Sequence, residues 1–220
     1  MCGRVGFFDD TGWKRALDQQ GIAYTDLVGE LHPSYNVAPS QPMATLLNNH
    51  DYTYTRFGLI PHWAKDAKFQ PINARAEIIA QKPTFKSAFV HRRCLIPVNG
   101  FYEWMKTESG KVPFWITPEK GGFFALAGVY DEWLDPATGD TVRGSAIITT
   151  DANRAMKPIH DRMPVIIEPK EWKLWLDPDV DEPEAVQPLL VPYGGVMHTK
   201  EVSTYVNSPV HNDEKCINEK

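Results

Sequence analysis

The 220-residue chain is predicted to be an α+β protein in which a mixed or antiparallel β-sheet curls into a partial barrel flanked by a few helices. Two observations predict this class. Strand-like apolar runs recur at short intervals and are broken by Gly or Pro, whereas helical patterns are few and unevenly placed. Because 42% of the residues are hydrophobic and the length suits one ordinary core, we expect a single domain over residues 1–220.

The helices are predicted from spacing. Trp13 and Leu17 lie four residues apart and Gly21 follows them, which predicts a short helix after an N-terminal strand. A second short helix is expected to end near Phe89. In the stretch 168–176 a proline near the first turn precedes three apolar residues of one helical face, and a shorter helix is expected around 182–190.

The strands are predicted from apolar runs of suitable length. They occupy residues 43–49, 52–61, 94–104, 112–118, 123–133, 143–150 and 198–203. The proline-punctuated segment 33–42 is interpreted as a loop with a tight turn, and the polar tail 211–220 is expected to be disordered.

Several classes of protein are excluded by motifs that the sequence lacks. It has no run of 18 apolar residues, no secretory signal, no phosphate-binding P-loop, no GxGxxG after a strand, and no GxSxG or HExxH motif. Three cysteines, Cys2, Cys94 and Cys216, are too few and too irregularly spaced for a disulfide framework or a zinc site. We therefore expect a cytoplasmic monomer without membrane contact, metal or cofactor, in which Cys94 is buried and inert.

The charge is unevenly distributed along the chain. The formal net charge is −5, which by itself argues against nucleic acid as a partner. Residues 56–106, however, hold nine Lys or Arg against three acids, whereas residues 111–220 hold 11 basic and 18 acidic residues. The basic middle is either a solvated face or a local groove for an anion.

The chain begins with Met1, Cys2, Gly3 and Arg4, and removal of the initiator methionine would leave Cys2 as the first residue. An α-amine has a pKa of about 7.7 to 8.0 and a thiol one of about 8.5, so both are usable nucleophiles near neutral pH. An amine condenses with an aldehyde to a Schiff base, and a neighbouring thiol can close onto the imine carbon as a thiazolidine. The alternative is an incidental residue on a frayed terminus.

Polar residues inside apolar runs are the other candidates. Glu103 lies between two aromatic residues and can act as a general acid or base, and His160 precedes an apolar strand and can carry a proton. Asn73 can donate a hydrogen bond to an oxyanion or hydroxyl, and Arg75 can hold a phosphate. Each candidate has a structural alternative. Glu103 could face solvent on a strand, His160 could be a structural histidine, and Asn73 and Arg75 could lie on an ordinary surface strand.

Six motifs, in this order, span most of the chain: MCGR at 1–4, YNVAP at 35–39, GLIPHW at 58–63, INARAE at 72–77, GFYEW at 100–104 and HDRMPVII at 160–167. With these motifs the chain resembles the SRAP family, the SOS response-associated peptidases or abasic-site processing proteins. The resemblance implies the SRAP fold and covalent capture of abasic sites in single-stranded DNA, through a thiazolidine on the N-terminal cysteine.

The resemblance also implies roles for individual residues. Cys2 would be the nucleophile, Asn73 would bind the opened sugar, Glu103 would drive ring opening and proton transfer, and His160 would assist at the Schiff base. Six residues are implied to contact DNA. Arg4 and Arg75 would bind phosphates, and Trp63 would stack on a base. The DNA groove would be lined by Asn36, Pro39 and Thr149. Some relatives carry two adjacent tryptophans where this chain has Trp63 and Ala64, so the stacking surface differs here.

Two other functions stay open at this stage. One is a cysteine peptidase with Cys2 as an N-terminal nucleophile, the activity in the family's name. The other is a non-covalent sensor that binds single-stranded DNA. A lyase side activity is also chemically accessible, because a Schiff base at the abasic carbon acidifies the neighbouring proton.

Overall fold

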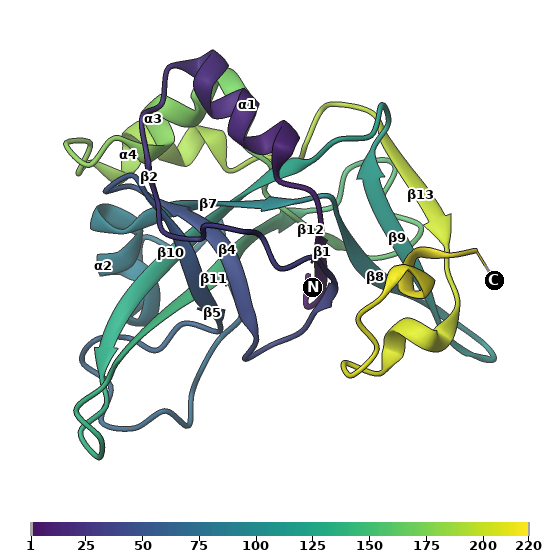
Figure 1. Ribbon diagram of the computed structural model, residues 1–220, viewed down its shortest axis with the longest axis horizontal. Coiled ribbons are helices and arrows are strands. Elements are labelled where there is room, and N and C mark those ends of the chain that lie inside the picture. Colours follow the sequence, from purple (N-terminus) through teal and green to yellow (C-terminus); the bar gives the residue numbers. More distant parts are fainter. Residues whose placement is uncertain (1, 220) are drawn as a thin grey trace.

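The computed structural model describes residues 2–219, and its centre is a closed five-strand barrel (Figure 1). Each barrel strand pairs with the next in the ring β4–β5–β11–β10–β7, and β7 returns to β4. The strands are β4 (Pro42–Leu47), β5 (Asp51–Phe57), β7 (Arg93–Val98), β10 (Phe124–Leu134) and β11 (Thr141–Asp151). The predicted fold class, α+β with a curled sheet, is confirmed.

The ring closes where β5 and β11 run parallel, and small residues make that closure possible. A Cβ on Gly144 would collide with the carbonyl oxygen of Gly58, so only glycine permits this approach. Inside the ring, the buried hydroxyl of Thr55 lies 2.8 Å from that of Thr45 and 2.7 Å from that of Ser145. These hydrogen bonds join β4, β5 and β11 where the barrel closes.

Three short strands extend the barrel sheet. β6 (Asn73–Arg75) continues the parallel pairing along β11, β12 (Arg162–Pro164) pairs antiparallel with the end of β11, and β2 (Thr25–Asp26) pairs with β5. The pairing of β6 and β12 with one strand brings residues 73–75 and 162–164 to the same end of the barrel.

A second, five-stranded sheet lies beside the barrel, with the order β13-β9-β8-β1-β3. Its strands are β1 (Val5–Phe7), β3 (Ser34–Val37), β8 (Gly100–Thr107), β9 (Gly110–Pro118) and β13 (Met197–Glu201). The run 94–104, predicted as one strand, is therefore two strands in two sheets. The chain changes sheet at Gly100, where a Cβ would lie 2.6 Å from the carbonyl oxygen of Ile116, and apolar composition does not mark such a crossing.

The helices cover one end and one side of the barrel (Figure 1). α1 (Thr11–Gln20) ends at Gly21, whose φ of 60° is left-handed, and it buries Trp13 and Leu17 as predicted. Further helical segments before residue 190 are α2 (Pro83–His91), η1 (Pro169–Glu171), α3 (Trp172–Leu176), α4 (Pro183–Val186) and η2 (Gln187–Leu189). In the described chain, no helix combines the length and apolar character needed to cross a membrane.

Two more segments, 34–37 and the C-terminal tail, differ from the prediction. Residues 34–37 form β3 rather than a loop, since they pair with β1. The prediction missed this strand because its partner is distant in sequence. The tail 211–220, predicted to be disordered, instead contains η4 (Glu214–Ile217), and Cys216 is fully buried. The tail follows η3 (Thr204–Asn207). The polar composition of the tail conceals these long-range contacts.

Candidate active site

Cys2 lies just before β1, where the barrel and the second sheet pack together. Its side chain is fully buried in an apolar cluster that includes Phe57 of the barrel and Phe101 of β8. Met156 and Ile159 belong to the same cluster. The predicted nucleophile is thus held in a defined position rather than on a frayed end.

Asn73 contacts Cys2 directly. Its side-chain nitrogen donates to the carbonyl oxygen of Cys2 at 2.9 Å and, more weakly, to that of Ile147 at 3.4 Å. The side-chain oxygen of Asn73 is buried and accepts no hydrogen bond from any residue between 2 and 219. Because a buried amide oxygen without a donor costs free energy, this atom is suited to receive a hydrogen bond from a bound group.

Glu103 is the buried carboxylate of the site, with 2% of its surface exposed. It lies on β8 two residues beyond Phe101, which pairs with Val5 of β1. This register brings the start of β1 alongside Glu103. Burial in the apolar cluster, and then the negative charge of Glu103, raise the pKa of the Cys2 thiol. The thiol is therefore protonated at neutral pH, with a carboxylate close enough to influence its ionisation.

His160 lies on the turn before β12 and is partly exposed. The backbone N–H of Arg162 donates to its Nδ1 at 2.9 Å, and the Asp161 carboxylate lies 2.8 Å from the same nitrogen. The first contact requires Nδ1 without a proton and the second requires Nδ1 with one, so the turn provides a partner for Nδ1 in either case. The neighbouring residues Met156 and Ile159 connect this turn to the cluster around Cys2.

Arg162 joins β6 to β12 and was missed as a site residue, although it lies in the quoted motif HDRMPVII. Its guanidinium donates to both carboxylate oxygens of Glu77, at 2.6 and 3.0 Å, to Asp151 at 2.7 Å and to the carbonyl oxygen of Thr149 at 2.6 Å. The hydrogen bond from Arg162 also holds the pKa of Glu77 below its ordinary range. The segment that carries Asn73 is thereby tied to the turn that carries His160.

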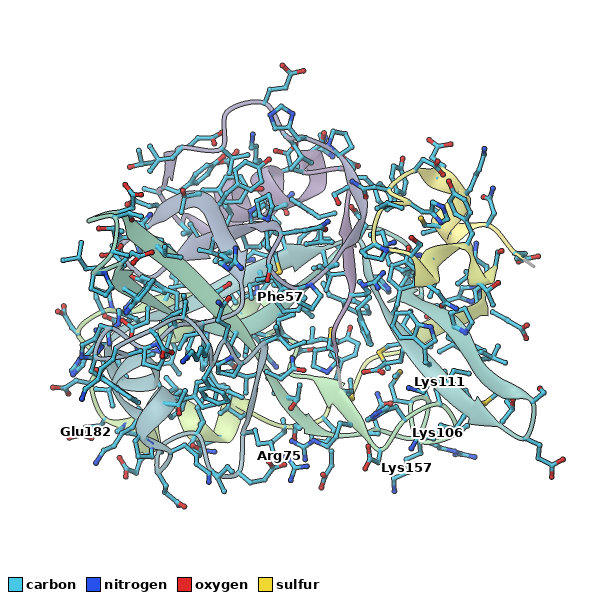
Figure 2. All side chains as sticks on the ribbon, turned by 90° about the horizontal axis from the view of Figure 1, so that it is seen from below. Phe57, Arg75, Lys106, Lys111, Lys157 and Glu182 are labelled. Atoms are coloured by element: carbon cyan, nitrogen blue, oxygen red, sulfur yellow. The ribbon has the colours of Figure 1, made fainter. Side chains whose placement is uncertain are left out.

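The residues predicted to contact DNA divide into two groups. Arg75, Trp63 and Pro39 are exposed, and Trp63 has 57% of its surface accessible. Figure 2 shows Arg75, Lys157 and Lys106 in the lower part of that view, with Glu182 of the acidic half at its lower left.

The second group is engaged inside the protein. Asn36 and Thr149 are fully buried, and Thr149 lies on β11 opposite Arg75. The guanidinium of Arg4 donates to the side-chain oxygen of Asn36 at 2.6 Å and to the carbonyl oxygen of Val206 at 2.9 Å. Their roles toward DNA stay predictions.

The loop that carries Trp63 is fixed by contacts that the sequence did not indicate. The buried carboxylate of Asp131 accepts from the backbone N–H of His62 at 3.0 Å, and the indole of Trp133 donates to the carbonyl oxygen of Ala64 at 2.7 Å. Phe69, on the same loop, is 62% exposed. The sequence could have indicated that Phe69 is exposed, because it is an aromatic residue between polar neighbours in a loop.

Among residues 2–219, no group of three or more His, Cys, Asp or Glu side chains is arranged to hold a metal ion. The candidate site consists instead of the buried thiol before β1, a buried carboxylate on β8 and an amide on β6 that contacts Cys2, with the imidazole of His160 on the turn before β12.

Comparison with known proteins defines the class. The sequence profile of the family described as "SOS response associated peptidase (SRAP)" matches residues 1–209, so the chain belongs to the SRAP family.

Individual relatives support the same assignment. The chain is 42% identical to "Abasic site processing protein YoqW" of Bacillus subtilis (strain 168), covering 99% of each chain. It is 29% identical to "Abasic site processing protein HMCES" of Xenopus tropicalis, over 84% of this chain and 65% of that protein. A crystal structure of a Bacteroides thetaiotaomicron protein superposes with a TM-score of 0.87 at 26% identity, covering both chains completely.

Proposed function

We propose that this protein captures abasic sites in single-stranded DNA as a covalent thiazolidine on Cys2, after removal of Met1. The observation that carries the proposal is the arrangement around Cys2. Its carbonyl oxygen is held by Asn73, and its thiol lies within electrostatic influence of the buried Glu103. Membership in a family whose relatives are named abasic site processing proteins supports the same reaction.

The first step uses the α-amine of Cys2. The sugar of an abasic site opens to an aldehyde when the proton of its anomeric hydroxyl is removed and the ring oxygen is protonated, and Glu103 can serve both transfers. The amine adds to C1′, and loss of one water gives the imine. The side-chain oxygen of Asn73, which accepts from no residue between 2 and 219, can accept from a sugar hydroxyl, and His160 can supply the proton that the departing water needs.

The second step uses the thiol. The sulfur adds to C1′ of the imine, the π-electron pair goes to nitrogen, and the thiol proton reaches that nitrogen through Glu103. The raised pKa of Cys2 means that the thiol arrives protonated, so a carboxylate beside it assists the attack. The balance is one aldehyde and one aminothiol giving one thiazolidine and one water.

The decisive experiment is the intact mass of the purified protein before and after incubation with a single-stranded oligonucleotide that carries one abasic site. We expect loss of Met1 before incubation and a gain of the oligonucleotide mass less one water afterwards. An oligonucleotide with tetrahydrofuran in place of the abasic sugar is the matched control, since it has no aldehyde. An equal adduct with that control, or none with either, would contradict the proposal.

Glu103 is predicted to control the rate of capture. Glu103→Gln keeps the shape of the side chain and removes its ability to accept a proton, so we expect adduct formation to slow about 10²- to 10⁴-fold, the usual contribution of a general acid or base. The measurement is the single-turnover rate of adduct formation at saturating protein. Glu108→Gln, an exposed change on the following turn, is the control, and equal rates for both variants would exclude this role.

Trp63 is predicted to hold DNA rather than to react. An exposed indole on a fixed loop offers a face on which a base can stack, a contact worth about 1 to 3 kcal/mol. Trp63→Ala should therefore weaken binding of unmodified single-stranded DNA about 5- to 150-fold, measured by fluorescence anisotropy at fixed salt. The adduct rate at saturating DNA should stay unchanged. Val196→Ala, another exposed apolar position, is the matched control.

A further inference from the structure

The segment 203–217 folds back over the second sheet, and we call it the C-terminal clasp. It contains η3 and η4 and appears in yellow beside β8 and β9 in Figure 1. Its own structure is well defined. The rings of Tyr205 and His211 stack with centroids 3.7 Å apart, and His211 Nδ1 lies 2.6 Å from the carbonyl oxygen of Tyr205.

The clasp holds the strand that follows Cys2. Arg4 donates through Nη1 to the carbonyl oxygen of Val206 at 2.9 Å and through Nη2 to that of Asn207 at 3.2 Å. The same guanidinium lies over the ring of Trp104, 5.8 Å from its centroid. Because β1 is only three residues long, these contacts add substantially to the few backbone hydrogen bonds that position the N-terminal end.

The clasp also holds β8 and β3. The indole N–H of Trp104, the residue after Glu103, donates to the side-chain oxygen of Asn207 at 2.8 Å. Asn36 of β3 donates through its side-chain nitrogen to the carbonyl oxygens of Val206 at 3.1 Å, Ser208 at 3.1 Å and His211 at 2.7 Å. One segment thus contacts the neighbours of both Cys2 and Glu103.

Asn212 closes the clasp on the outer side of β3. Its side-chain oxygen accepts from the hydroxyl of Ser34 at 2.9 Å and from the backbone N–H groups of Tyr35 at 2.8 Å and Asn36 at 2.9 Å. A single exposed side chain therefore satisfies three donors of β3. Substitution of this residue disturbs the clasp without touching the candidate active site.

We propose that the C-terminal clasp aligns Cys2 with Glu103, and that Arg4 is the positioning residue through which it acts. The proposal deepens the proposed function and rests on it. Three of the hydrogen bonds that the Arg4 guanidinium can donate already go to protein oxygens, two of them on the clasp. A residue that binds phosphate changes the affinity for DNA and its salt dependence, whereas a positioning residue changes the rate of capture.

The first test uses the three cysteines as internal reporters, because all three are fully buried and they lie on different elements, before β1, on β7 and in η4. Cys2 reports on the site, Cys216 on the clasp and Cys94 on the barrel. Alkylation by iodoacetamide is followed for each cysteine by peptide mass spectrometry in the full-length protein.

For Asn212→Ala we expect alkylation of Cys216 and Cys2 to accelerate about tenfold, because three donors lose their acceptor, while Cys94 keeps its wild-type rate. Asn212→Asp retains the acceptor oxygen and should restore slow labelling at both positions. Faster labelling of Cys216 with Cys2 unchanged would overturn the proposal. If alkylation of Cys94 also accelerates in Asn212→Ala, the same labelling is measured in Asn36→Asp instead. This variant keeps the oxygen that accepts from Arg4 and loses the side-chain N–H groups that donate to the clasp.

The second test separates positioning from phosphate binding. For Arg4→Ala we expect the single-turnover rate of adduct formation to fall at least tenfold, with the slope of log K against log salt for unmodified single-stranded DNA unchanged. Loss of one phosphate contact would reduce that slope by about 0.7, and such a change with an unaltered rate would overturn the proposal. If the wild-type protein forms no adduct, the proposed function fails, and the labelling experiment still decides whether the clasp holds Cys2.

Discussion

Replacement of Cys2 by alanine is expected to abolish the adduct with abasic single-stranded DNA that survives denaturation in SDS. The α-amine of the substituted first residue can still form an imine, but imines hydrolyse and no sulfur is present to close the ring. We expect the yield after one hour to fall at least 100-fold, measured by gel shift under denaturing conditions. Cys94→Ala, which removes a buried thiol from the barrel, is the matched control and should leave the yield unchanged.

Cys2→Ser sharpens the same prediction, because it keeps the shape of the side chain and replaces only the sulfur. Reduction with borohydride should trap the imine of this variant, whereas without borohydride the stable adduct should be absent. If Cys2→Ala yields as much SDS-stable adduct as the wild type, the thiazolidine mechanism is wrong. If peptide hydrolysis depending on Cys2 and Glu103 is found instead, the peptidase alternative is favoured.

Retention of Met1 is expected to be as damaging as loss of the thiol. With Met1 in place the nitrogen of Cys2 is an amide, whose lone pair is delocalised and cannot add to an aldehyde. Protein made with methionine aminopeptidase inhibited has the same thiol but no free amine on Cys2. We expect its adduct yield to fall at least 100-fold, with the degree of processing read from the intact mass.

Treatment of that unprocessed protein with purified aminopeptidase is the control, and it should restore the yield in proportion to the Met1 removed. Detection of an equal yield of SDS-stable adduct whose mass still contains Met1 would contradict this prediction. The two predictions are independent, since one removes the sulfur and the other blocks the nitrogen of the same residue.

The sequence predicted the local elements well where periodicity carries the information. The helix after residue 10 was correctly placed because Trp13 and Leu17 repeat at helical spacing and Gly21 ends it. The strand at 52–61 was predicted too long. β5 ends at Phe57, because Gly58 takes a φ of 136° and leaves the sheet. Such an ending depends on backbone geometry at one glycine, which an apolar run does not reveal.

The candidate site was predictable only as a set of residue types. Glu103 was conspicuous because a carboxylate lies between aromatic residues, and the structure confirms that its side chain is buried. The contact of Asn73 with the carbonyl oxygen of Cys2 spans 71 residues of chain and has no local signature. The same holds for Arg162 and Glu77, whose ion pair joins two motifs that the sequence presents separately.

The sequence by itself determined the family and pointed to Cys2 as the candidate nucleophile, because six ordered motifs and a cysteine at position 2 are properties of residue identity alone. Only the tertiary structure decided how that chemistry is held. Pairing of β1 with β8 brings Cys2 beside Glu103, and the polar tail 211–220, predicted to be disordered, instead packs against β3 through Asn212. The physical reason is that burial and hydrogen bonding between distant segments depend on closure of the whole fold, which no local pattern encodes.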